Sequence, residues 1–362
     1  MKYYETSFEE YVHAKKQLNL HPELEYINEN LPENIEELKN IIIYGSTGTG
    51  KYSIALDIIN KYSNNQLKFD KRTIVVTDKQ NYNLKMSDIH YEIDISLLGC
   101  NSKQLWNEIF LKIVDIVSVQ KEKQGIILCK NFHSIHSELL DIFYSYIQQH
   151  NHSQANIKIV FILITEQLSF FPKQLIETSQ IINVKRPSKE LHKKYIDILQ
   201  KRNDTYKKTQ ENYFKNNSLS KKSKNSIIEN IPVNTIINLK ELHAFPLIEK
   251  NKKELPEDHF NIICDKIIRE LNNCKNIEFT AFRDCLYDIL TYNLDLNECL
   301  WYVLNYYVTN NLICTEDISE ILAQSFSFLK YYNNNYRPIY HLESIFFTIL
   351  QKIKHNDIKN EF

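Results

Sequence analysis

The stretch Ile41–Ser53, IIIYGSTGTGKYS, is the part of the sequence that most clearly indicates the fold. An apolar run closed by glycine is expected of a strand buried on both faces of a parallel sheet. The next residues match G-x-x-x-x-G-K, a pattern in which backbone N–H groups wrap a phosphate and the lysine reaches the terminal phosphates. A helix starting there adds the positive end of its dipole. The predicted nucleotide contacts are Gly45, Ser46, Thr47, Gly48, Thr49, Gly50, Lys51, Tyr52 and Ser53.

The sequence supports nucleotide binding better than it supports nucleotide hydrolysis. Magnesium is usually held by a hydroxyl directly after the lysine and by a carboxylate at the end of a neighbouring strand. Tyr52 takes the first position, and Ser53, one residue late, is the predicted metal contact through a shifted geometry or a water. The best strand for the carboxylate, 125–132, ends in Cys129 and Lys130, and Asp94 is more typical of a helix cap. The sequence therefore favours nucleotide binding without hydrolysis, and a glycine-rich turn that holds no ligand stays as the alternative.

Composition narrows the class of protein. The chain has 362 residues, enough for two or three domains, and its 44 Lys+Arg nearly balance its 45 Asp+Glu, so any nucleic-acid contact needs a local patch. Three of only five glycines lie in the loop. The seven cysteines are scattered without a C-x-x-C pair, which indicates a reducing, intracellular compartment. The charged N-terminus has no signal-like apolar region, and no apolar run approaches about 18 residues, so no membrane span is expected.

Alternation of apolar and amphipathic segments predicts the architecture. Strands are expected at 40–45, 72–78, 89–99, 124–132, 157–165 and 180–187, and helices at 52–63, 102–119 (with Ser102 as N-cap) and 137–150. This order predicts an open parallel α/β sheet with its ligand at the carboxyl ends of the strands. The polar, basic stretch at about 201–226 is predicted to be an insertion, and everything after about 227 is predicted to be helical.

The order of these motifs resembles the small subunits of clamp loaders (replication factor C), in the AAA+ superfamily. Besides the loop, the similar stretches are HYEIDISLLGCNSKQLWNEIF (90–110), GIILCKNFHSIHSELLDIFYSYIQ (125–148), NIKIVFILITEQLSFFPKQLIETSQIINVKRPSKE (156–190) and YRPIYHLESIFFTIL (336–350). The resemblance implies an AAA+ P-loop domain at 1–187, a helical lid at 188–258 and an all-α collar at 259–362. It also implies ATP or ADP with Mg²⁺, other clamp-loader subunits held through the collar, a sliding clamp, primer–template DNA and a nuclear or other site of DNA replication.

The departures from that family concern catalysis. Cys129 and Lys130 replace the strand-end acids, the polar sensor residue falls at Thr165 and Glu166, and the family's arginine, which reaches the neighbouring subunit's phosphate, falls at 178–180, where this chain has none. Such an arginine is worth about 10³–10⁵ in rate. The resemblance thus implies a subunit that binds nucleotide but neither hydrolyses it nor completes its neighbour's site. The rival hypotheses are an active stand-alone ATPase using Asp94 or Glu166, and a scaffold without nucleotide.

Other side chains invite weaker interpretations. His133 and His136 lie three residues apart without an evident third metal ligand, so surface or capping roles are favoured. The tyrosine-rich C-terminal segment has helical spacing, which favours core and subunit interface over base stacking. The lysines of the basic insertion are expected to be solvated rather than bound to DNA phosphates.

Overall fold

The computed structural model describes residues 7–76, 81–99, 101–150, 156–188, 190–191, 194, 259–273, 278–292, 294–332 and 337–360. They fall into two compact units, one built on a β-sheet and one that contains the C-terminal helices and the short segment Gln167–Pro172, and each is considered by itself. The predicted lid at 188–258, with its basic insertion, lies almost entirely outside the described residues. The bounds of the three predicted domains therefore stay predictions.

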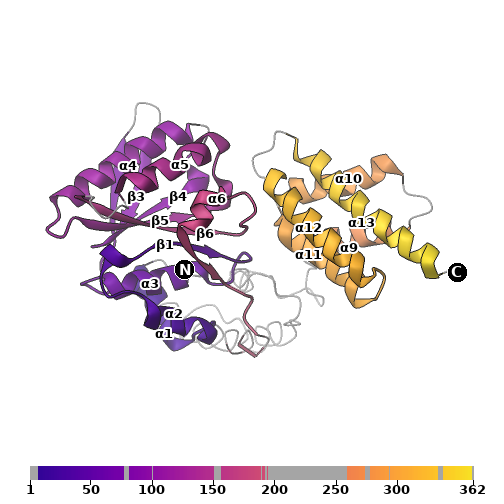
Figure 1. The fold of residues 1–362 in the computed structure, drawn as a ribbon, viewed down its shortest axis with the longest axis horizontal. Helices are drawn as coiled ribbons and strands as arrows, with labels where there is room; N and C mark the ends of the chain where they lie inside the picture. Colours follow the sequence, from indigo (N-terminus) through magenta and orange to yellow (C-terminus); the bar gives the residue numbers. More distant parts are fainter. Residues whose placement is uncertain are drawn as a thin grey trace, which may run out of the picture. The chain divides into compact units, whose positions relative to one another are not determined.

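A seven-stranded sheet organises the first unit, in the order β2-β3-β4-β5-β6-β1-β7 (Figure 1). The strands are β1 (Asn40–Tyr44), β2 (Lys71–Val76), β3 (Asn81–Met86), β4 (His90–Asp94), β5 (Gln124–Lys130), β6 (Lys158–Thr165) and β7 (Ser179–Asn183). From β4 to β7 all neighbouring strands are parallel, which confirms the predicted α/β class. The strand that leads into the phosphate loop lies inside the sheet, between β6 and β7.

The sheet departs from the predicted parallel arrangement at one edge only. There β2 and β3 form an antiparallel hairpin, and β3 also runs antiparallel to β4. Strand β3 was not predicted, because its sequence NYNLKM turns only Tyr82 and Leu84 fully inward and leaves polar residues between them. A strand with two buried side chains gives a weak alternating signal.

Helices cover both faces of the sheet, α4 and α5 on one side and α1, α2 and α3 on the other (Figure 1). Their bounds are α1 (Phe8–Gln17), α2 (Glu25–Asn30), α3 (Lys51–Tyr62), α4 (Ser102–Val119), α5 (Ser137–His150) and α6 (Lys173–Glu177), with short 3-10 turns at Pro22–Leu24, Ile35–Glu37, Ile95–Leu97 and Phe132–Ser134. Ser102 is the first residue of α4 and not its N-cap, which is Asn101. The predicted capping role was therefore one position off.

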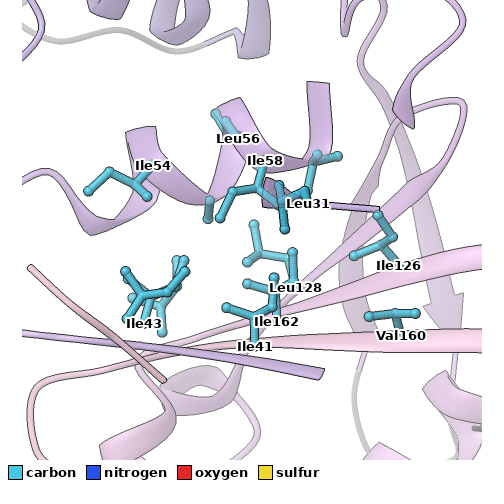
Figure 2. Close-up of a cluster of buried hydrophobic side chains, with 14 of the residues drawn as sticks. Leu31, Ile41, Ile43, Ile54, Leu56, Ile58, Ile126, Leu128, Val160 and Ile162 are labelled. Atoms are coloured by element: carbon cyan, nitrogen blue, oxygen red, sulfur yellow. The ribbon is translucent and has the colours of Figure 1, made fainter. Parts of the chain in front are cut away.

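Branched aliphatic side chains fill the layer between α3 and the sheet (Figure 2). Ile41 and Ile43 of β1 lie against Ile54 and Ile58 of α3, and all four are at most 5% exposed. Fully burying one such side chain contributes about 1.5–3 kcal/mol. This packing fixes the position of α3 on β1, and therefore the position of the loop that joins them.

Within the described residues, the regular elements of the second unit are all helices, as predicted for the C-terminal part. They are α9 (His259–Asn272), α10 (Phe279–Thr291), α11 (Leu296–Thr309), α12 (Thr315–Tyr332) and α13 (Pro338–Asn360). Buried residues such as Leu286, Val303 and Phe346 form its core. Several large apolar side chains stay exposed on these helices, among them Trp301 at 58% and Phe326 at 59%. None of the helices in the described part of the chain is long and apolar enough to cross a membrane.

Candidate nucleotide site

The predicted phosphate loop joins the end of β1 to the start of α3. Gly50 stands directly before α3 with a φ of 96°, a left-handed conformation that costs glycine little. Gly45 is required for a different reason, because a Cβ placed on it would come 2.2 Å from the backbone oxygen of Val184. The two glycines therefore serve the shape of the turn and the close approach of the segment after β7.

The ammonium group of Lys51 lies inside the loop. Lys51 is the first residue of α3 and only 8% exposed, and its Nζ donates to the backbone oxygens of Gly45 at 2.6 Å and Ser46 at 2.7 Å. The Thr49 hydroxyl donates to the same Ser46 oxygen at 2.9 Å. The ammonium is thus held within the loop, where it can meet the negative charge of a phosphate.

A residue that sequence reasoning missed supports the loop from outside. His21 is 4% exposed, and its Nε2 donates to the Thr49 backbone oxygen at 2.6 Å. The ring also lies next to Gly50, whose added Cβ would be 3.6 Å from His21 Nε2. Because His21 lies 28 residues before Thr49, no local motif could have indicated this contact.

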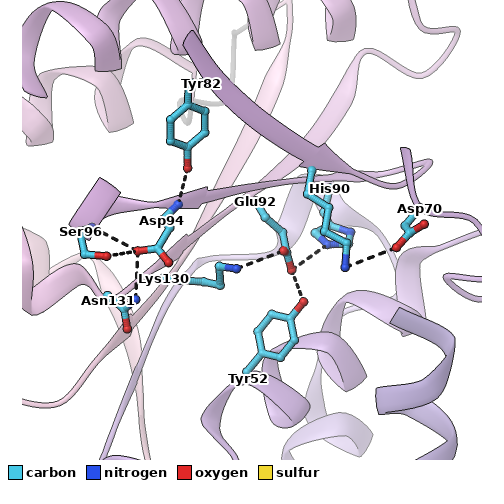
Figure 3. Close-up of polar contacts among 10 residues, drawn as sticks. Tyr52, Asp70, Tyr82, His90, Glu92, Asp94, Ser96, Lys130 and Asn131 are labelled. Carbon is cyan, nitrogen blue, oxygen red and sulfur yellow. Dashed lines mark hydrogen bonds and ion pairs between the residues drawn. The ribbon is translucent and has the colours of Figure 1, made fainter. Parts of the chain in front are cut away.

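Tyr52 stands at the position of the usual metal-holding hydroxyl, but its own hydroxyl is hydrogen-bonded within the protein. Its hydroxyl donates to Oε1 of Glu92 on β4 at 2.5 Å (Figure 3). The ring also makes an edge contact with Tyr11 of α1, with centroids 4.8 Å apart. Burial and the neighbouring Glu92 carboxylate raise the pKa of Tyr52 well above its ordinary value, so the phenol keeps its proton and remains a donor.

Glu92 is the centre of a buried polar cluster that the sequence did not indicate. Its side chain is 2% exposed, and Oε2 lies 3.4 Å from Nζ of Lys130 at the end of β5 (Figure 3). His90 Nε2 lies 3.7 Å from Oε1. Burial by itself raises the pKa of Glu92, but His90, the Lys130 charge and the Tyr52 hydrogen bond outweigh burial and lower the pKa to about 2. Glu92 is therefore ionised throughout the physiological range.

The remaining strand-end residues carry no free acid. Cys129 is fully buried, and burial raises the pKa of its thiol, so it stays neutral. Asp94 caps the 3-10 turn after β4, as the sequence favoured, with Oδ1 accepting from the Ser96 backbone N at 3.2 Å and from Asn131 Nδ2 at 3.0 Å. At the carboxyl ends of β4 and β5, the Asp94 carboxylate is therefore engaged in hydrogen bonds within the protein.

Glu166 directly follows β6. Thr165 is paired with Tyr44 in the sheet, so the next residues, Glu166 and Gly45, leave the same edge together. Glu166 Oε2 lies 3.6 Å from Nε2 of His133, which gives His133 a carboxylate neighbour rather than a metal partner. Among the described residues there is no group of three or more His, Cys, Asp or Glu side chains that could hold a metal ion.

The donor set does not fit an octahedral magnesium ion, which needs oxygen ligands and usually one or two carboxylates besides the phosphates. Ser53 is the one predicted metal contact, and its side chain is half-buried in the first turn of α3. Its metal-binding role stays a prediction. The stretch 178–180, where an arginine would be needed, brings Thr178, Ser179 and Gln180 to the start of β7.

No protein-family model matches the chain, and no curated protein matches it either. Among solved structures it is similar to PCH-2 of C. elegans, at 14% identity and a TM-score of 0.32, over 70% of this chain and 59% of that chain. It is also similar to a RuvB mutant from Thermotoga maritima, at 16% identity and a TM-score of 0.30, over 53% and 52% of the two chains.

A third similar structure is the FIGL-1 AAA domain in complex with ADP, at 12% identity and a TM-score of 0.30, over 53% of this chain and 60% of that chain. The chain thus spans about half to three fifths of the length of these proteins. At such identities and TM-scores the likeness decides neither the family nor the function.

Proposed function

We propose that this chain is a nucleotide-binding AAA+ subunit of the clamp-loader type that holds ATP or ADP without hydrolysing it. The observation that carries the proposal is the loop after β1, in which the nearly buried Lys51 ammonium is held by the Gly45 and Ser46 carbonyls at the start of α3. Phosphates bind at such helix starts because backbone N–H groups and a lysine converge there.

The proposed lack of hydrolysis is inferred from the residues on β4 and at the end of β5. Hydrolysis needs a carboxylate or a similar group to orient the attacking water, and a metal to neutralise the phosphate oxygens. At the end of β5 the chain has the neutral thiol of Cys129 and the ammonium of Lys130. Lys130 is paired with the buried Glu92, so this carboxylate is already engaged.

The clamp-loader part of the proposal rests on the resemblance of the sequence motifs and on the exposed apolar side chains of the helical unit. Trp301 and Val308 on α11, and Leu322 and Phe326 on α12, are each at least 38% exposed. Apolar groups of this size suit subunit contacts. The proposed partners are other clamp-loader subunits, a sliding clamp and primer–template DNA, at the nucleus or another site of DNA replication.

The test is binding of ADP and ATP to the full chain by calorimetry, together with steady-state ATP turnover. Lys51→Ala should abolish binding, whereas Lys112→Ala, which changes an exposed lysine of α4 on the opposite face of the sheet, should leave it unchanged. Turnover that Glu166→Gln or Asp94→Asn removes would favour the stand-alone ATPase instead. A chain that binds neither nucleotide would favour the scaffold.

The assembly needs a separate measurement. The chain should form a defined complex with clamp-loader small subunits from the same source when they are co-expressed, measured by size-exclusion chromatography with light scattering. Trp301→Ser together with Phe326→Ser should weaken that complex and leave ADP affinity unchanged. A full-length, folded chain that forms no such complex would contradict the clamp-loader part while leaving the nucleotide site intact.

A further inference from the structure

We propose that the phosphate loop takes its nucleotide as the metal-free anion, because Tyr52 and Lys130 stand at the positions that would otherwise hold magnesium and both are engaged with the buried Glu92. The inference rests on the proposed nucleotide binding and deepens it. It names the form of the ligand and the residues that select this form.

The first magnesium ligand of such a site would be a hydroxyl on the first turn of α3. Tyr52 has a hydroxyl, but the aromatic ring places it next to β4, where it donates a hydrogen bond to Glu92 at 2.5 Å. The edge contact with Tyr11 holds the ring on this path. A phenol that keeps its proton is a poor ligand for Mg²⁺, which prefers carboxylates, phosphate oxygens and water.

The second ligand would be a carboxylate at a strand end. Glu92 lies on β4, two residues before the carboxyl end of the strand. However, its side chain is 2% exposed and both of its oxygens have partners, Tyr52 on Oε1 and Lys130 on Oε2. Drawing Glu92 toward a metal would leave the Lys130 ammonium without its carboxylate. Glu92 would also lose the hydrogen bond from Tyr52, so a metal would have to displace both existing partners of this buried carboxylate.

Lys130 adds a charge of the wrong sign for a metal. It ends β5, whose carboxyl end lies at the same edge of the sheet as the phosphate loop, because β5, β6 and β1 are parallel. Its Nζ lies 5.5 Å from the centre of the Tyr52 ring, and its side chain is 32% exposed. An ammonium at this edge repels a divalent cation and attracts phosphate oxygens.

The other carboxylates at this edge are engaged in contacts of their own. Asp94 accepts from Ser96 and Asn131, and Glu166 lies 3.6 Å from His133 Nε2. Ser53 then remains as a single neutral oxygen. One hydroxyl without a carboxylate is a weak basis for holding a magnesium ion, even when phosphates supply further oxygens.

The experiment is a calorimetric titration of the full-length chain with ADP, once with excess Mg²⁺ and once with EDTA. The proposal expects an affinity in EDTA at least equal to that in Mg²⁺. Binding that is tenfold or more weaker in EDTA would overturn the proposal and leave the proposed function standing. No binding in either buffer would overturn both, so the two failures are distinguishable.

A converting variant tests the assigned residues. Tyr52→Thr combined with Lys130→Asp restores a hydroxyl and a carboxylate, and Tyr52→Thr with Lys112→Asp makes the same charge change on the opposite face. The first pair should make ADP binding at least tenfold tighter in Mg²⁺ than in EDTA, and the second should not. If the first pair folds, judged by the fluorescence of the buried Trp106 in a Trp301→Phe background, and its ADP affinity still does not depend on the metal, the assignment to Tyr52 and Lys130 is wrong. If it does not fold, the wild-type titrations alone decide.

Discussion

Replacing Glu92 with glutamine is expected to destabilise the sheet unit by about 3 kcal/mol at pH 7. In the folded chain the pKa of Glu92 lies at about 2, against an ordinary value of 4.5. Each pH unit of difference corresponds to about 1.4 kcal/mol, so ionised Glu92 contributes on the order of 3 kcal/mol relative to its protonated form. The side chain is 2% exposed, so solvent screens its contacts little.

The pH dependence follows from the sign of this shift. Because the folded state lowers the pKa, the contribution is fully present above about pH 5 and is lost as the pH falls through 4.5 toward 2. The difference in stability between wild type and Glu92→Gln should therefore shrink to about half by pH 3. Loss of other acid-sensitive contacts affects both proteins and cancels in this difference.

The assay must report on the sheet unit alone, because a chain with two compact units need not unfold in one step. The protein has two tryptophans: Trp106 is a fully buried residue of α4 in the sheet unit, and Trp301 is 58% exposed on α11. In a Trp301→Phe background, fluorescence during urea unfolding follows Trp106 only. We expect the midpoint of the Glu92→Gln variant to fall clearly below that of the parent at pH 7.

The matched control is Glu122→Gln, which removes an exposed carboxylate before β5 and should change the free energy of unfolding by less than about 0.5 kcal/mol. If the Glu92→Gln and parent curves differ by the same amount at every pH, the carboxylate is not ionised with a lowered pKa. The physical description of the cluster around Glu92 would then be wrong.

The phosphate loop and β1 provide further expected outcomes. Gly45→Ala should abolish ADP binding and lower the melting temperature, because its Cβ would come 2.2 Å from a backbone oxygen next to β7; normal melting and ADP titrations would contradict this. His21→Leu should weaken ADP binding about tenfold, the effect of losing one buried hydrogen bond of about 1.4 kcal/mol to the Thr49 carbonyl. His21→Gln, whose amide can also donate, should keep most of the affinity, and equal affinities of the two variants would count against this role. Asn40→Ala should cost about 1–3 kcal/mol in urea unfolding, since the buried Asn40 accepts from the Phe161 backbone N at 2.9 Å; an unchanged midpoint would refute that contribution.

Local features of the fold were predictable from the sequence. The run Ile41–Ile43 became a fully buried strand, and Ile54, Ile58 and Ile59 became the buried side of α3. Such patterns work because a strand buried on both faces and a helix with one buried face each have a fixed spacing of apolar residues. The role of Asp94 as a cap was predictable for the same reason, since its partner is two residues away.

The contacts around the site were not predictable in this way. Sequence reasoning treated Tyr52 as a nucleotide contact without the metal-holding hydroxyl and Lys130 as the replacement of an acid, and it did not consider Glu92 as a partner of either. The structure joins these three side chains, although they lie on α3, β5 and β4. It also places His21 against the loop from a segment that carried no functional motif.

The sequence by itself therefore determined the parallel α/β class, the phosphate loop between β1 and α3, and the helical C-terminal part. These depend on the spacing of residues that are near one another in the chain. Only the tertiary structure decided that Tyr52 serves Glu92, that Lys130 neutralises Glu92, and that His21 supports Thr49. These contacts join residues that are 28 to 40 positions apart. They depend on the order and register of the strands and on how the helices pack on them, which no local pattern specifies.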